Sequence, residues 1–295
     1  MKILVTGANG MLGQDLCPIL EDVGAFVIET DVDTLDITNA EQVKQVLADI
    51  RPDMVVHCAA YTNVDKAEED LKTAELINVT GTENIAEACG KLGITLVYIS
   101  TDYVFDGESV EPYTPEDMPN PINNYGCTKY EGEEAVRSLC EKYYVVRTSW
   151  LYGHHGKNFV ETMLNLASKP ELKVVDDQVG CPTWTVELAN GILKLLSKPY
   201  GTYHVCGSGF TTWYGFAKEI FEQYNQICHL EQGERSQKDS SDKPQNDKLG
   251  TGLKPCTTEE FPRPAKRPKY SVMDNGGLCR NWQAALHDYL ELREV

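Results

Sequence analysis

The sequence predicts an α/β protein built on a doubly wound parallel sheet, and three observations predict this class. The chain opens with a strand that runs directly into a glycine-punctuated turn and a helix, over 2–20. Strand-like apolar runs then alternate with helical patterns through the first 150 residues, as is typical of a parallel sheet. Hydroxyl and carboxylate groups follow one of these runs, at the strand end where α/β proteins place their chemistry.

Composition and charge narrow the class of function. The 295 residues suffice for one large domain or two intimate ones. Lys and Arg number 27 against 45 Asp and Glu, and the net charge of −18 disfavours nucleic acid and anionic membranes as partners. One local basic patch, 263–269, departs from this balance.

Targeting and redox signals are weak. No apolar run approaches the roughly 18 residues of a membrane span, and a strand beginning at Lys2 leaves no room for a signal peptide, so we expect a cytoplasmic protein. The ten cysteines are scattered singly, without the spacing of a zinc site. We expect them to be reduced packing residues, and we assign no metal site.

The first strand and helix carry the strongest binding signal. Three glycines stand at GxxGxxG spacing: Gly7 for a tight turn, Gly10 for close approach of a ligand, and Gly13 for close packing of the helix on the strand. The helix opens at Met11 and Leu12, so its free N–H groups would face a pyrophosphate. A glycine triplet alone fits an ordinary turn equally well, but this position between strand and helix favours a Rossmann-type dinucleotide site.

The second strand, 25–30, ends at Asp31, where a carboxylate would accept hydrogen bonds from the adenosine ribose. Asp36 and Ile37 are placed to meet the adenine. No Lys or Arg stands between Lys2 and Lys44, so a 2′-phosphate has no local cation, which slightly favours NADH over NADPH and leaves use of both open. A solvated loop carboxylate is the alternative interpretation of Asp31.

The alternation continues with a helix over 39–50 and a third strand over 53–57. Small or hydroxyl-bearing residues follow and would line the cofactor crevice: Ala59, Ala60, Tyr61 and Thr62. A helical region containing 82–89 precedes the fourth strand, 94–100. That strand ends in Ser100, Thr101 and Asp102, groups able to do chemistry, although Thr is also a common strand residue.

Tyr125 and Lys129 open the next helix, which is predicted from Asn124 through Leu139, and their spacing of four puts them on one helix face. A tyrosine pKa lies near 10, and a neighbouring ammonium should lower it. Lys129 would thus tune Tyr125 as a general acid and hold the nicotinamide ribose, while Thr101 hydrogen-bonds the same substrate oxygen. A YxxxK pair is common by chance, and its context after the glycine motif makes it specific.

The sequence resembles the extended short-chain dehydrogenase/reductases and, within them, the dTDP-4-dehydrorhamnose reductase family. The matching segments are TGANGMLG (6–13), AAYTNVDKAE (59–68), INVTGTENIA (77–86), STDYVFDG (100–107), YGCTK (125–129), RTSWLYG (147–153), DDQVGCPTW (176–184) and PAKRPKYSVMD (264–274). The resemblance implies hydride transfer from NADH or NADPH to the C4 ketone of dTDP-4-dehydro-L-rhamnose, giving dTDP-L-rhamnose, with Thr101, Tyr125 and Lys129 as the catalytic set.

The resemblance also implies a substrate site. Asp102, Tyr103, Val104 and Trp150 would line the sugar pocket, and Arg267 would meet the nucleotide diphosphate unless it belongs to a solvated basic tail. Related 4,6-dehydratases carry Asp-Glu after the catalytic Thr, whereas Tyr103 follows Asp102 here, so elimination is disfavoured. Three alternatives stay open: a reductase of another nucleotide sugar, an epimerase, and a non-catalytic regulatory subunit on the same fold. A homodimer is compatible with the resemblance.

The second half predicts a smaller C-terminal α/β substrate domain. We expect residues 1–150, with about 184–206, to form the dinucleotide-binding domain, and 151–183 with 207–295 to form the substrate domain. Helices are predicted over 158–167, 186–196 and 212–224, the last capped by Thr211 or Thr212, with strands at 174–183 and 200–205. The polar stretch 232–254 suggests a mobile loop, and Trp282, Leu286 and Leu290 form one face of a closing helix.

Overall fold

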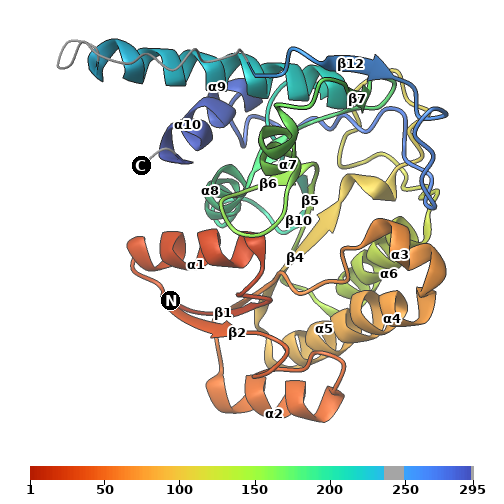
Figure 1. Ribbon diagram of the computed structural model, residues 1–295. Helices are drawn as coiled ribbons and strands as arrows, with labels where there is room; N and C mark the ends of the chain where they lie inside the picture. The colour runs from red at the N-terminus through yellow and green to blue at the C-terminus, as the bar shows by residue number, and fades with distance from the viewer. Residues whose placement is uncertain (236–248, 294–295) are drawn as a thin grey trace.

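The computed structural model describes residues 1–235 and 249–293, and its largest element is a six-stranded parallel sheet (Figure 1). The strand order is β10-β5-β4-β3-β1-β2. The strands are β1 (Lys2–Thr6), β2 (Phe26–Thr30), β3 (Met54–His57), β4 (Thr95–Thr101), β5 (Tyr143–Thr148) and β10 (Gly201–His204). The predicted doubly wound α/β class is therefore confirmed, with β5 as a strand that the sequence reasoning did not predict.

Helices cover both faces of the sheet. One face carries α1 (Met11–Asp22) and α8 (Thr185–Leu195), and the other carries α2 (Ala40–Ile50), α5 (Gly81–Leu92) and α6 (Asn124–Leu139) (Figure 1). Because side chains alternate along a strand, Ile3 and Val5 pack with Leu16 of α1 while Leu4 packs with Leu47 of α2. Both faces of β1 are thus buried.

Local signals in the sequence fix the helix ends. The Asn39 side chain accepts a hydrogen bond from the Gln42 N–H and starts α2, and Asn123 does the same for α6 through Gly126. Gly93 ends α5 in the left-handed region, with φ of 67°. Between β3 and α5 the chain forms α3 (Val64–Glu69), α4 (Leu71–Glu75) and a π-helical turn, η1 (Leu76–Thr80).

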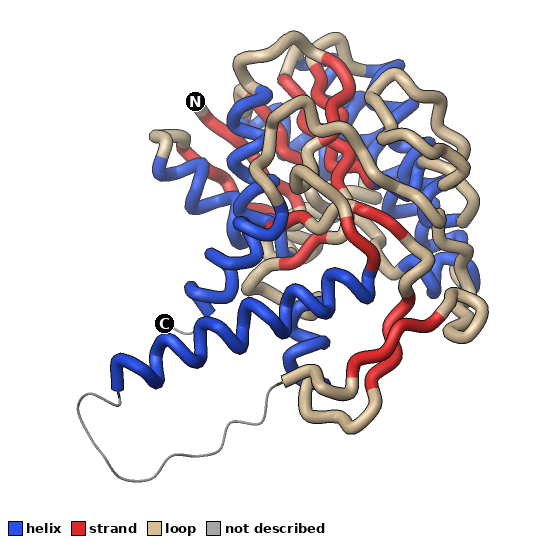
Figure 2. Tube along the Cα trace, turned by 90° about the horizontal axis from the view of Figure 1, so that it is seen from above, coloured by secondary structure: helices blue, strands red, loops and turns tan. Residues whose placement is uncertain are grey.

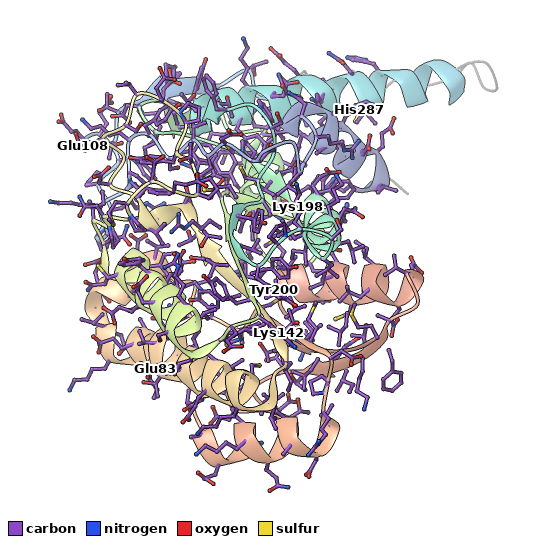
Figure 3. All side chains as sticks on the ribbon, turned by 180° about the vertical axis from the view of Figure 1, so that it is seen from behind. Glu83, Glu108, Lys142, Lys198, Tyr200 and His287 are labelled. Atoms are coloured by element: carbon purple, nitrogen blue, oxygen red, sulfur yellow. The ribbon has the colours of Figure 1, made fainter. Side chains whose placement is uncertain are left out.

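The order in which strands are added to the sheet reverses at β1, which pairs in parallel with β2 on one side and with β3 on the other. The carboxyl ends of β1 and β3 therefore border a crevice at this switch point. On the opposite edge, α8 returns the chain to β10, which pairs with β5. Figure 3, seen from behind, labels Lys198 and Tyr200 in this connection, where the Tyr144 hydroxyl donates to the Lys198 carbonyl at 2.8 Å.

A smaller α/β region lies beyond the carboxyl ends of the strands. It contains three two-stranded sheets, β11-β8, β12-β7 and β6-β9, together with helices α7 (Phe159–Leu166), α9 (Trp213–Arg235) and α10 (Trp282–Arg293). Their strands are β6 (Leu151–Tyr152), β7 (Leu172–Val175), β8 (Val179–Gly180), β9 (Thr183–Trp184), β11 (Thr211–Thr212) and β12 (Leu253–Cys256). Trp282, Leu286 and Leu290 are buried in its core, and α10 lies beside α9 (Figure 2).

The predicted loop over 232–254 is wrong at both ends. Helix α9 continues to Arg235, since the residues that follow Cys228 are mostly good helix formers. At the other end, Leu253 and Lys254 begin β12, which pairs in parallel with β7. Residues 236–248 lie outside the described residues. Of the two residues predicted to cap α9, Thr211 and Thr212, the structure shows Thr212 in this role. Its hydroxyl accepts a hydrogen bond from the Gly215 N–H at 2.9 Å.

Seven of the ten cysteines are buried, as expected of packing residues, and their reduced state stays a prediction. Among the described helices none is long and apolar enough to cross a membrane.

Candidate active site

A cavity of about 830 Å³ lies at the carboxyl ends of the central strands, beside the glycine turn. It brings together most of the site residues predicted from the sequence: Gly7, Gly10, Met11, Leu12, Gly13, Asp31, Asp36, Ile37, Ala59, Ala60, Thr62, Thr101, Asp102, Tyr103, Tyr125, Lys129 and Trp150. The segments that follow β1, β2 and β3, together with β4 and α6, therefore contribute to one concave site, as expected at the switch point of an open α/β sheet.

The glycine turn is shaped by two close approaches. Gly7 has φ of +66°, and a Cβ there would stand 2.7 Å from the Ala59 nitrogen. A Cβ on Gly13 would stand 2.5 Å from the Ala8 carbonyl oxygen. No side chain caps the start of α1 at Gly10, so the N–H groups of its first turn are available to a phosphate. The geometry fits a dinucleotide pyrophosphate.

The end of the cavity beyond β2 presents carboxylates and, among the described residues that line it, no cation. The Asp31 carboxylate accepts from the backbone N–H groups of Asn9, at 3.0 Å, and Val32, at 2.8 Å, which ties the glycine turn to β2. Asp36 accepts from both the N–H and the hydroxyl of Thr38. Among the described residues that line the cavity, Lys129 is the one cation, and it belongs to the opposite end.

Thr101, Tyr125 and Lys129 converge at that opposite end. Thr101 is the last residue of β4, and its hydroxyl hydrogen-bonds the Tyr125 hydroxyl from the first turn of α6. Lys129 follows one turn later, with its side chain 2% exposed and its ammonium 4.1 Å from the centre of the Tyr98 ring. The three groups predicted as the catalytic set thus share one wall of the cavity.

Burial dominates the protonation of these groups. It raises the pKa of Tyr125 well above its usual range, against the effect of its hydrogen bond with Thr101, so the expected lowering by Lys129 does not prevail. The same burial lowers the pKa of Lys129 to about 7, although the negative charge of Glu133 acts in the opposite direction. Burial also raises the pKa of Asp102 to about 6, against hydrogen bonds from Ser271 and Thr101.

A buried ion pair that sequence reasoning missed supports this wall. The Arg147 guanidinium of β5 binds the Glu133 carboxylate of α6 through Nε at 2.9 Å and Nη2 at 2.8 Å, and both residues are at most 1% exposed. The Ser100 hydroxyl donates to the same carboxylate at 2.6 Å. These contacts join β4, β5 and α6 directly behind Thr101 and Lys129. No local sequence pattern relates the partners.

Asn78 is a second supporting residue missed as a functional position, although it lies in the quoted segment 77–86. It is buried in η1, accepts from the Tyr61 N–H at 2.8 Å, and donates to the Tyr61 carbonyl at 3.1 Å and the Thr128 hydroxyl at 3.0 Å. Tyr61 itself lies outside the set of cavity-lining residues. Asn78 therefore holds the backbone of the crevice beside α6.

Trp150 lines the part of the cavity where the sugar is expected to bind. Its backbone is in the left-handed region, with φ of 46°, and its indole stacks on Trp213 of α9 with ring centroids 3.6 Å apart. Gly180 leaves room for the indole, since a Cβ there would lie 2.5 Å from the Trp150 ring. Trp213 had no motif to mark it in the sequence.

Two predicted substrate residues lie outside the cavity lining. Val104 is completely buried in an apolar cluster with Phe105, because the 3₁₀ turn η2 (Asp102–Val104) directs it inward. Arg267 instead donates to Asp65 at 2.5 Å and hydrogen-bonds Tyr103, which does line the cavity. Arg267 thus contacts the site through another side chain.

Fold and site together define a nicotinamide-dependent oxidoreductase of the Rossmann type. The family model described as RmlD substrate binding domain matches residues 1–293, and the chain belongs to this family. Spore coat polysaccharide biosynthesis protein SpsK of Bacillus subtilis is 40% identical over 299 residues, covering 99% of this chain and 98% of that protein. A dTDP-4-dehydrorhamnose reductase of Streptomyces griseus is 40% identical, over 96% of this chain and 91% of its own length.

Solved structures of dTDP-4-dehydrorhamnose reductases are also similar to this chain. A dTDP-4-dehydrorhamnose reductase of Clostridium acetobutylicum has a TM-score of 0.90 and 46% identity, with 100% of each chain covered. A dTDP-4-dehydrorhamnose reductase of Bacillus anthracis, in complex with NADP, has a TM-score of 0.87 and 40% identity, over 100% of this chain and 99% of that one. A UDP-glucose 4-epimerase of Thermus thermophilus, at 20% identity and a TM-score of 0.75, shares the fold.

Proposed function

We propose that this chain reduces the C4 ketone of dTDP-4-dehydro-L-rhamnose to dTDP-L-rhamnose, with Tyr125 as the proton donor. The observation that carries the proposal is the convergence of Thr101, Tyr125 and Lys129 on the cavity that begins at the glycine turn. The names of the full-length relatives support the substrate. We also propose that residues 1–150 with about 184–206 hold the cofactor, while 151–183 with 207–295 hold the sugar nucleotide.

The residues present fit a reduced nicotinamide dinucleotide, which supplies the hydride when bound. As the ketone carbon accepts the hydride, negative charge develops on its oxygen, and the Tyr125 Oη–H transfers its proton there. The Thr101 hydroxyl stabilises the same oxygen by a hydrogen bond. Lys129 supplies positive charge that favours the departing phenolate, provided that its ammonium stays protonated. Tyr125 then regains a proton from solvent.

We further propose that NADH is preferred over NADPH. The adenosine end of the cavity presents Asp31 and Asp36, and no Lys or Arg among the described residues lines it. A 2′-phosphate would therefore meet carboxylates without a compensating cation. The NADP complex of the B. anthracis protein makes the comparison of both cofactors necessary.

The test is oxidation of NADH and, separately, NADPH by the purified chain with dTDP-4-dehydro-L-rhamnose, followed by absorbance. We expect oxidation that Tyr125→Phe abolishes, with a higher kcat/KM for NADH. If wild type and Tyr125→Phe oxidise cofactor equally, Tyr125 is not the proton donor. If neither cofactor is oxidised although both bind, the proposed substrate is wrong.

One relative suggests the first alternative substrate. A dTDP-4-keto-6-deoxy-D-glucose reductase of Streptomyces niveus is 44% identical over 221 residues, covering 74% of this chain and 77% of its own length. The same assay with dTDP-4-keto-6-deoxy-D-glucose separates the two sugars. A higher kcat/KM for that compound would replace the proposed substrate and leave the roles of Thr101 and Tyr125 unchanged.

A further inference from the structure

Asp102 occupies a position that the proposed reaction has not used. It follows β4 directly, lines the cavity, and is only 2% exposed. Both carboxylate oxygens have hydroxyl partners: Thr101 donates to Oδ1 at 3.1 Å and Ser271 donates to Oδ2 at 2.6 Å. Ser271 lies 169 residues further along the chain, so two distant segments meet on this one side chain.

The hydrogen atoms around Thr101 limit what it can do. A hydroxyl has one hydrogen to donate and two lone pairs to accept. One lone pair accepts the Tyr103 N–H at 3.2 Å, and the hydroxyl also bonds Tyr125. While Asp102 is ionised, its carboxylate can only accept hydrogen bonds. Thr101 therefore donates its one hydrogen to Asp102 and can only accept a hydrogen bond from Tyr125. The Tyr125 proton is then directed at Thr101 and away from the cavity.

A protonated Asp102 reverses this arrangement. Its Oδ1–H donates to the second lone pair of Thr101, and the Thr101 hydrogen is released toward Tyr125 and the ketone oxygen. With the ketone bound, the Thr101 hydrogen donates to the ketone oxygen, and Tyr125, which no longer donates to Thr101, points its own proton at the same oxygen, as a general acid must. No additional atom is required, because only the Asp102 proton distinguishes the two arrangements.

We propose that Asp102 is a positioning residue whose carboxylic acid form turns the Thr101 hydroxyl toward Tyr125 and the substrate oxygen. The inference rests on the proposed reductase function and adds a protonation requirement to it. The polar and titratable groups that face Asp102 are Tyr125 of α6, Tyr103 of η2, the Cys206 thiol after β10, and Ser271. Burial raises the pKa values of both tyrosines, and a hydrogen bond with Cys181 together with burial raises that of the Cys206 thiol, so all of these neighbours are neutral near pH 6.

The test is the pH profile of kcat/KM, which reports ionisations of the enzyme before substrate binds. With Asp102 titrating near its pKa of about 6, wild-type kcat/KM should fall about tenfold between pH 5 and 7. Asp102→Asn carries an amide that donates to Thr101 at every pH, so its profile should lack this tenfold fall and drop only about twofold by pH 7, where Lys129 loses its proton in both proteins. Asp106→Asn, the same change four residues away, should keep the wild-type fall.

Ser271→Ala gives a signed second test that leaves Asp102 in place. The Ser271 hydroxyl stabilises the ionised carboxylate, so its removal should raise the pKa of Asp102 and move the fall to higher pH. A purely structural role of Ser271 would lower kcat/KM at all pH values without moving the profile. This variant also decides the question if Asp102→Asn does not fold.

A readout independent of turnover is difference infrared spectroscopy of the unliganded protein. The carboxylic acid carbonyl band should disappear with a midpoint near pH 6 in wild type and be missing in Asp102→Asn. An Asp102 that is fully ionised at pH 5, or an Asp102→Asn profile equal to that of wild type, overturns the inference while Tyr125→Phe still tests the reductase. Lack of cofactor oxidation by wild type at every pH overturns the proposed function, and the inference with it.

Discussion

Replacing Arg147 by Met tests how much its buried ion pair with Glu133, behind Thr101 and Lys129, contributes to the free energy of unfolding. The substitution leaves the Glu133 carboxylate, itself fully buried, without the bidentate partner that holds it at 2.9 and 2.8 Å. Removing one member of a buried pair typically costs about 3–5 kcal/mol. Ser100 and Arg137 still bind Glu133, which places the expected loss near ~3 kcal/mol, the lower end of that range.

Urea denaturation of the two proteins measures this loss, provided that the slope of the transition stays unchanged. A loss of this size is a large part of the roughly 5–15 kcal/mol that stabilises a typical domain. Lys44→Met is the control, because it removes a 3.0 Å ion pair with Glu41 on the exposed side of α2 and should leave the midpoint unchanged. A loss below about 1 kcal/mol for Arg147→Met would show that the buried pair is not isolated from water.

The double variant Glu133→Leu with Arg147→Met distinguishes charge from packing. If the loss comes from an unpaired buried charge, removing Glu133 as well should recover part of it, since no uncompensated ion remains in this pair. A double variant as unstable as the sum of the two single variants would refute this account. It would assign the loss to the volume and shape of the side chains.

Three further outcomes are expected. Gly13→Ala places a Cβ 2.5 Å from the Ala8 carbonyl, so α1 must move and NADH affinity, measured by fluorescence titration, should fall by about tenfold or more. Burial lowers the pKa of His57 to about 3 and that of His204 to about 4, so the unfolded state binds both protons first on acidification, while the raised pKa of Asp102 offsets about 1 kcal/mol; urea stability should fall by about 2 kcal/mol from pH 6.5 to 5, and a constant midpoint would contradict this. Trp213→Ala removes the stacking partner of Trp150 and should raise the KM of the sugar nucleotide several-fold without weakening NADH; an effect on NADH alone would contradict it.

The parts of the fold that could be predicted are those written into short stretches of sequence. The segment from Lys2 to Gly13 specifies a buried strand, a tight turn and a helix start by itself, and the structure has all three. Strand β5, which was not predicted, has a short run of β-favouring residues, Tyr143–Val146, followed by the charged Arg147. That guanidinium is buried only because Glu133, from another element, neutralises it.

Contacts between distant segments also account for the wrong prediction over 232–254. Lys254 and Pro255 are poor strand residues, yet β12 forms because the backbone of β7 offers a parallel partner, which local composition does not reveal. Polar composition likewise did not exclude a helix, and α9 extends to Arg235. Tertiary pairing therefore decides elements that local propensity leaves open.

The residues of the candidate site likewise fall into two groups, those that the sequence could identify and those that it could not. Thr101, Tyr125 and Lys129, the proposed catalytic set, lie in short segments that sequence spacing could identify. The groups that fix their hydrogen-bond directions and charges gave no sign of this role: Ser271 is 169 residues from Asp102 in sequence, and Glu133, on the same helix as Lys129, is neutralised by Arg147 of β5. Two relatives that share the catalytic segments can thus catalyse the same reaction and still differ in its pH dependence, if one of them lacks the hydroxyl that faces the carboxylate after β4.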